Sequence, residues 1–174
     1  TVWTVSNFFS AAECQEWINF CEESGGLEYT AHPATMYTAH RKCFRMQDQS
    51  NTKLAETLYL RLVSSGILEQ LQRALMMNNK PALPSTKNKF NKYEHPVGLN
   101  PNLRLYKYTK GHSFGKHIDQ SNIVDCMMGL TEITVLIYLS ECQGGATRFY
   151  PSHKKKRSFS FDPEPGTLLL HVHG

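Results

Sequence analysis

The sequence lacks long apolar runs, paired cysteine motifs and a strong excess of charge. No apolar stretch approaches the roughly 20 residues that a membrane helix needs, so we expect no membrane partner. The five cysteines are odd in number and form no C-x-x-C pair, which argues against a zinc ribbon or a disulfide scaffold. They favour thiols in a reducing compartment, with the cytoplasm as the first choice. The net charge of +4 gives no argument for a nucleic-acid partner.

The chain has 174 residues, of which 40% are hydrophobic and 20% are charged. This length and composition predict one globular domain over residues 1–174, large enough for a sizeable core. Residue 1 is Thr rather than Met, so we expect the N-terminus to be shortened. Nothing in the composition indicates an oligomeric state.

The first 77 residues are predicted to be mainly helical. Ser10 and Glu13 form a capping box, which predicts a helix that runs to about Ser24 and stops at two glycines. Leucines spaced four apart predict a second helix over 52–63, and a third is expected over 67–77. Short strands are predicted over residues 2–9 and 42–46.

The second half changes character. Residues 78–101 are polar and contain four prolines, which predicts either a solvated connection or a lid over a binding site. From residue 102 onward, strand patterns alternate with turns. Helices followed by strands predict an α+β fold, with the helices packed on a β-sandwich or jelly roll. The predicted strands cover residues 103–108, 131–140, 146–150, 158–161 and 167–173.

The most informative motif is His117-Ile118-Asp119. Residues two apart on an extended backbone point to the same side, so an imidazole nitrogen and a carboxylate oxygen can reach one metal ion. They are two of the three ligands in the facial triad that holds non-haem Fe(II). A three-residue pattern occurs often by chance, and the flanking segments therefore decide its meaning.

Those segments resemble the Fe(II)- and 2-oxoglutarate-dependent dioxygenases, in particular the prolyl 4-hydroxylase-like branch. The resemblance is close over about residues 100–174, in both order and spacing. The matching segments are Leu103–Tyr108, Gly111, His117–Asp119, Val135–Leu139, Gly144–Phe149 and Gly166–Leu170.

The resemblance implies a double-stranded β-helix with iron at one mouth. His117 and Asp119 match the first two iron ligands, and Tyr108 and Tyr138 match tyrosines that line the 2-oxoglutarate pocket. The implied cofactors and cosubstrates are Fe(II), 2-oxoglutarate, O₂ and ascorbate. The implied reaction is hydroxylation of a peptide or protein side chain, most of all proline.

The third ligand departs from the family pattern. In the family register, a distal His and the Lys or Arg that pairs with 2-oxoglutarate follow the strand that starts at Gly166. Both positions lie past Gly174, so we expect a chain truncated at its C-terminus, with the third ligand beyond it. His171 and His173 are the alternatives within the sequence, since they share one strand face.

Two other functions compete with the hydroxylase. The first is a non-catalytic binding module, a β-sandwich that has lost the triad. A His followed by a Lys or Arg after Gly174 would argue against this function. A demethylase on the same fold is the third hypothesis. The modest charge and the Gly144-Gly145-Ala146-Thr147 segment argue against the demethylase.

Overall fold

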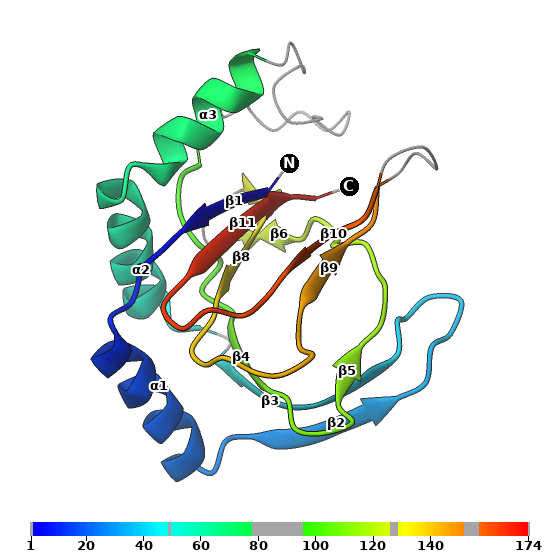
Figure 1. Cartoon of the computed structure of the whole chain (residues 1–174). Coiled ribbons are helices and arrows are strands. Elements are labelled where there is room, and N and C mark those ends of the chain that lie inside the picture. The colour runs from blue at the N-terminus through cyan, green and yellow to red at the C-terminus, as the bar shows by residue number, and fades with distance from the viewer. Residues whose placement is uncertain (1, 49, 78–95, 126–128, 152–156, 174) are drawn as a thin grey trace.

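The computed structural model describes residues 2–48, 50–77, 96–125, 129–151 and 157–173. These residues combine helices with antiparallel strands, so the predicted α+β class is confirmed (Figure 1). The helices are α1 (Ala11–Glu23), α2 (Thr52–Ser64) and α3 (Ile67–Met77). Within the described part of the chain, no helix is both long and apolar enough to cross a membrane.

Side chains at the helix starts explain where α1 and α2 begin. Ser10 accepts a hydrogen bond from the Glu13 backbone N–H, and the Glu13 carboxylate accepts one from the Ser10 N–H, so the predicted capping box is present. Asn51 caps α2 by accepting from the Leu54 N–H at 3.1 Å. The Arg61 guanidinium on α2 also pairs with the Glu13 carboxylate, which ties the two helices together.

One three-stranded antiparallel sheet packs against the helices. Its order is β1 (Val2–Val5), β11 (Leu168–Val172) and β8 (Ile133–Ile137). Leu168 and Leu170 project from one face of β11 into the apolar core, which they share with Phe8, Phe9, Cys14, Leu62 and Ile67. Because side chains alternate along a strand, the opposite face carries Leu169, His171 and His173.

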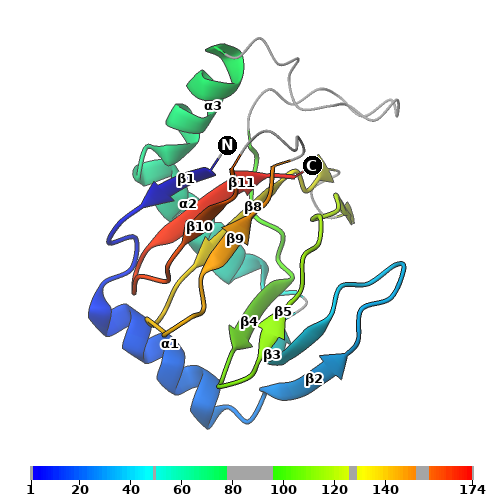
Figure 2. The ribbon, with the colours of Figure 1, turned by 45° about the vertical axis from the view of Figure 1, so that its right-hand side comes forward.

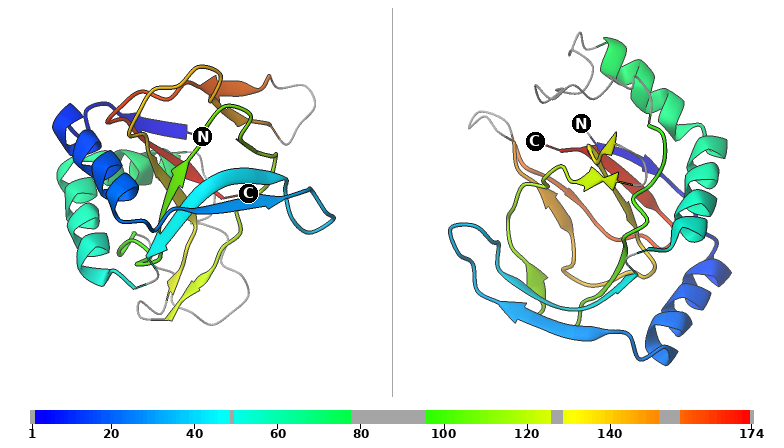
Figure 3. Two further views of the ribbon diagram at one scale, coloured as in Figure 1. Left: turned by 90° about the horizontal axis from the view of Figure 1, so that it is seen from below. Right: turned by 180° about the vertical axis from the view of Figure 1, so that it is seen from behind.

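A second antiparallel sheet lies across from the first (Figures 1 and 2). It has the order β2 (Glu28–His32), β3 (Arg41–Asp48) and β4 (Leu103–Lys107), with β5 (Ser113–Phe114) also paired to β3. Figure 3 shows the helices along one side of the molecule and β2 and β3 at the end away from β1 and β11. Two short pairs complete the described strands: β6 (Ile123–Val124) with β7 (Gly129–Leu130), and β9 (Thr147–Phe149) with β10 (Phe159–Phe161).

Gly166 joins the helical layer to the first sheet. Its N–H donates to the Tyr138 carbonyl at 2.7 Å, and its carbonyl accepts from the Phe9 N–H at 3.1 Å. Its φ of 76° lies in the left-handed region that glycine favours. A Cβ on this residue would come within 2.1 Å of the Phe9 carbonyl oxygen, so only glycine fits the junction.

The predicted helices agree with the observed ones within a residue or two. The strands predicted after residue 102 are found with shorter bounds, and the one predicted over 131–140 is only half as long, at Ile133–Ile137. The strand predicted over residues 2–9 ends at Val5, because Phe8 and Phe9 turn into the core. Strand β2 was not predicted, so the first 77 residues hold more sheet than expected. Of the proposed lid, residues 78–95 lie outside the described residues.

The Glu13–Arg61 pair predicts how stability depends on pH. The hydrogen bonds from Arg61 and from Ser10 lower the pKa of the Glu13 carboxyl from 4.5 to about 2. A lowered folded-state pKa contributes stability above pH 4.5 that is lost as the pH falls toward 2. We therefore expect Glu13→Gln, which keeps the capping side chain, to be less stable than wild type at pH 7, with the difference shrinking below pH 4.5.

Urea unfolding at a series of pH values between 7 and 2 measures this difference. Glu16→Gln, at an exposed position of the same helix, is the control and should follow the wild-type curve. A stability difference between wild type and Glu13→Gln that stays constant down to pH 2 would contradict the prediction.

Candidate metal centre

A large open cavity lies between the two main sheets. Its volume is about 3650 Å³, and residues of both sheets and of all three helices line it. Single-ligand pockets usually measure ~300–1,000 Å³, so this cavity is an open space that extends from the sheets to the helices rather than one binding pocket. His117, Asp119, His171 and His173 all line it.

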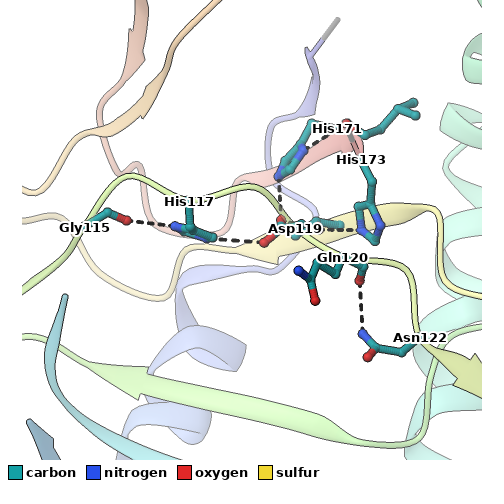
Figure 4. Close-up of polar contacts among 9 residues, drawn as sticks. Gly115, His117, Asp119, Gln120, Asn122, His171 and His173 are labelled. Atoms are coloured by element: carbon teal, nitrogen blue, oxygen red, sulfur yellow. Dashed lines mark hydrogen bonds and ion pairs between the residues drawn. The ribbon is translucent and has the colours of Figure 1, made fainter. Parts of the chain in front are cut away.

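His117 and Asp119 lie together, as the sequence predicted. The His117 Nε2 atom is 3.2 Å from Asp119 Oδ1. Ile118 between them is 73% exposed, which is the alternation expected of an extended segment. The Nδ1 atom of His117 lies 2.8 Å from the Gly115 carbonyl oxygen. Because a carbonyl only accepts, Nδ1 carries the proton, and Nε2 is the nitrogen that faces Asp119 (Figure 4).

The two histidines of β11 are placed differently. His171 Nε2 lies 3.4 Å from Asp119 Oδ2. His173 makes no such contact; its Nε2 lies 3.0 Å from the Thr134 hydroxyl. Thr134 donates its one proton to Asp119 Oδ2 at 2.6 Å, so its oxygen must accept from His173. Of the two candidates, His171 therefore reaches Asp119 directly (Figure 4). His173 reaches it only through Thr134.

The pairing of strands explains this arrangement. His171 lies directly opposite Thr134 across the β11–β8 ladder, and directly opposite residues in an antiparallel pair share one face of the sheet. Asp119, from the segment before β6, approaches that face and meets both side chains. The side chains thus come from three segments that are distant in the sequence.

The chemistry of these donors fits a cation. Both His117 and His171 have a backbone carbonyl near Nδ1, at 2.8 and 3.3 Å, so each ring, when it carries only one proton, presents the lone pair of Nε2 to the Asp119 carboxylate. Lone pairs that face a carboxylate need a proton or a metal ion between them. Two imidazole nitrogens and a carboxylate are also the donor types of a non-haem Fe(II) site.

The positions are not yet those of a closed metal site. In the described part of the chain, no three His, Cys, Asp or Glu side chains are grouped tightly enough to hold an ion as they stand. His117 and His171 contact different oxygens of Asp119, so their nitrogens do not converge on one point. The donors fit the metal by type, and small side-chain rotations would have to bring them onto it.

The charges of the site are strongly coupled. The hydrogen bond with Asp119 raises the pKa of His117 above its ordinary value, although partial burial opposes the shift. The same bond, helped by the Thr134 hydroxyl, holds the pKa of Asp119 well below its ordinary range. Burial lowers the pKa of His173, and its Nδ1 is buried without a hydrogen-bond partner among the described residues. Asp119 is therefore an anion at neutral pH, and His173 is neutral.

The two tyrosines expected at the cosubstrate pocket also line the cavity. Tyr138 follows β8 and shares the face of Thr134 by strand alternation. Its hydroxyl donates to the Thr147 hydroxyl at 2.8 Å, and its ring stacks on Phe161. Tyr108 follows β4 and is 45% exposed, yet burial raises the pKa of its phenol to about 12. Neither tyrosine contacts His117 or Asp119 through a hydrogen bond.

Comparison with known families agrees with this geometry. Residues 103–173 match the model of the 2OG-Fe(II) oxygenase superfamily. The match spans less than half of the chain, and it contains His117, Asp119, Thr134, His171 and His173. No curated protein and no solved structure gave a significant match. The match supports this superfamily and a 2-oxoglutarate-dependent oxygenase activity.

Sequence reasoning missed several residues around the site. Thr134 lies in an apolar strand and was not predicted to belong to the site. A polar residue in such a strand could have indicated it, because a buried hydroxyl needs a hydrogen-bond partner. The Gly115 carbonyl leaves no sequence signal at all. Further along the cavity wall, His112 is half-buried and packs on Tyr29 and Phe44.

Thr134 gives the site a testable property. It holds the Asp119 carboxylate, and loss of such an orienting partner typically weakens metal binding by about 10- to 100-fold. We expect Thr134→Val, which keeps the shape and removes the hydroxyl, to raise the Kd for Mn(II) by about this factor. Thr134→Ser keeps the hydroxyl and should bind nearly as wild type does.

Isothermal titration of the full-length protein with Mn(II), a redox-stable substitute for Fe(II), measures the effect. Equal affinities of wild type and Thr134→Val would show that the hydroxyl does not orient Asp119 for metal binding.

Proposed function

We propose that this protein is an Fe(II)- and 2-oxoglutarate-dependent oxygenase that hydroxylates a peptide or protein side chain, most of all proline. One observation carries the proposal: His117 Nε2 and Asp119 Oδ1 lie 3.2 Å apart at the cavity, so an imidazole nitrogen and a carboxylate oxygen can reach one metal ion. The family match over residues 103–173 supports the reaction class. The two facing antiparallel sheets are consistent with the double-stranded β-helix of that family.

In this proposal each residue of the site has one role. His117 and Asp119 hold Fe(II), which together with 2-oxoglutarate and O₂ supplies the oxidising power for hydroxylation. The Gly115 carbonyl keeps the proton of His117 on Nδ1, so that Nε2 stays available. Thr134 holds one oxygen of Asp119, and His173 in turn holds Thr134.

The two tyrosines are assigned to the cosubstrate. Tyr108 and Tyr138 line the same cavity as the metal ligands. Their raised pKa values keep both phenols protonated at neutral pH, so each can donate a hydrogen bond to a carboxylate. Tyr138 already donates to Thr147, and it would have to exchange that partner for the cosubstrate.

The direct test is succinate formation from 2-oxoglutarate by the full-length protein with Fe(II). A panel of proline-containing peptides and their alanine counterparts identifies the substrate, and mass spectrometry detects a gain of one oxygen. Turnover that depends on proline supports the proposal. A protein that binds peptides without forming succinate would instead be the non-catalytic binding module.

Asp119 provides the first prediction for this reaction. We expect Asp119→Ala to abolish succinate formation, because the site loses its carboxylate donor. The protein should stay folded, with a lower unfolding temperature because the contacts of Asp119 with His117 and Thr134 are lost. Asp162→Ala, at an exposed position, is the control and should retain full turnover. Near-wild-type turnover of Asp119→Ala would refute the assignment, and global unfolding would make Asp119 a structural residue.

The third metal ligand can be assigned by a second pair of variants. The family register puts the distal histidine after Gly174, and we propose that ligand rather than His171. His171 then acts only as a neighbour of Asp119, so its loss should cost less metal affinity than the loss of a ligand. We expect His117→Gln to raise the Kd for Mn(II) by more than about 100-fold, and His171→Gln by about 10-fold or less.

The same titration of the full-length protein measures both variants, and circular dichroism checks their folding. If His171→Gln loses as much affinity as His117→Gln, then His171 is the third ligand and the proposed distal histidine is wrong.

A further inference from the structure

Arg41 is a charged side chain of the cavity that the proposed mechanism does not use. It is the first residue of β3 and lies opposite Phe114 of β5. Its guanidinium carbon is 3.8 Å from the centre of the Phe114 ring and 5.4 Å from the centre of the Tyr106 ring. Cation–π contacts at these distances hold the guanidinium in place.

The stack continues to the metal centre. The His117 ring lies 3.8 Å from the Phe114 ring, with an angle of 22° between the two planes. Two groups at this distance from one ring centre would collide if they lay on the same face. Arg41 and His117 therefore lie on opposite faces of Phe114, and only the thickness of one ring separates the guanidinium from a proposed metal ligand.

The Arg41 side chain has unused hydrogen-bonding capacity. Its Nη1 is buried and has no hydrogen-bond partner among the described residues, and no carboxylate of those residues forms an ion pair with it. A buried guanidinium without an acceptor is costly. The Arg41 side chain as a whole is only half-buried and lines the cavity, so a ligand in the cavity can supply an acceptor to its accessible nitrogens.

We infer that Arg41 binds a carboxylate group of a ligand in this cavity. Contacts between the face of a guanidinium and an aromatic ring do not use the N–H donors, and a carboxylate can accept two parallel hydrogen bonds from such a planar fork. The Tyr108 phenol lines the same cavity and remains protonated, so it can donate a hydrogen bond to an anion bound there. The identity of the ligand rests on the proposed function, which offers two carboxylates: that of 2-oxoglutarate and that of an acidic peptide substrate.

Binding measurements on the full-length protein test this inference without turnover. The probes are 2-oxoglutarate in the presence of Mn(II), and a matched pair of proline peptides that differ only in Glu against Gln. Arg41→Met removes the charge and keeps an unbranched side chain. Arg73→Met is the control, because it makes the same change on the exposed surface of α3.

We expect Arg41→Met to raise the Kd for either 2-oxoglutarate or the Glu peptide by about 10- to 100-fold, the size of a lost charge-assisted hydrogen bond. Arg73→Met should stay within about twofold. If Arg41→Met weakens the affinity for 2-oxoglutarate alone, the cosubstrate provides the carboxylate that Arg41 binds. If Arg41→Met weakens the affinity for the Glu peptide and leaves that for the Gln peptide unchanged, the peptide substrate provides the carboxylate. Unchanged Kd values for all three probes would overturn the inference.

A second measurement uses the wild-type chain and does not depend on how a variant folds. Phenylglyoxal modifies accessible guanidinium groups, and mass spectrometry locates the modified arginine. The probe that binds should slow modification of Arg41 and leave Arg73 unaffected. Equal modification of Arg41 with and without both probes would refute the assignment. Carboxylate binding through Arg41 in a protein that never forms succinate would refute the proposed oxygenase reaction and leave this inference standing.

Discussion

Strand β11 is hydrogen-bonded along both of its edges, to β1 and to β8, and this pairing positions both the core and the site. Alternation along the strand sends Leu168 and Leu170 toward the helices and His171 toward the cavity. A shift of one residue in this register would reverse the two faces. The burial of Leu168 and Leu170 in the helix-side core therefore also keeps the His171 side chain on the cavity side of the sheet.

Asp119 is the electrostatic centre of the site. It is half-buried, and it is surrounded by two imidazole rings and a hydroxyl that donates to it. A carboxylate in such surroundings would be destabilised by partial burial alone, but its donors more than offset that cost, as its lowered pKa indicates. The site is thus prepared for positive charge before any cation binds, which is the property expected of a preorganised metal centre.

Local signals in the sequence were sufficient for the helices and for the His117–Asp119 pair, because capping, leucine spacing and alternation act over a few residues. The choice between His171 and His173 could not be made in that way. Both lie on one face of one strand, and only the register with β8 separates them. Arg41 was also beyond sequence reasoning, since its role depends on Phe114, more than 70 positions away. Strand β2 escaped notice because its residues are largely polar and exposed.

The pairing of β1 with β11 also has a kinetic consequence. Val2 lies opposite His171, so the first sheet is complete only when segments more than 160 positions apart have met. Contacts of such long sequence separation form slowly, because the entropy of closing the intervening loop must be overcome first. The helices can form early from local contacts, whereas the sheet face that carries His171 forms late in folding. During refolding, metal-binding competence should accordingly appear after most of the helical signal has returned.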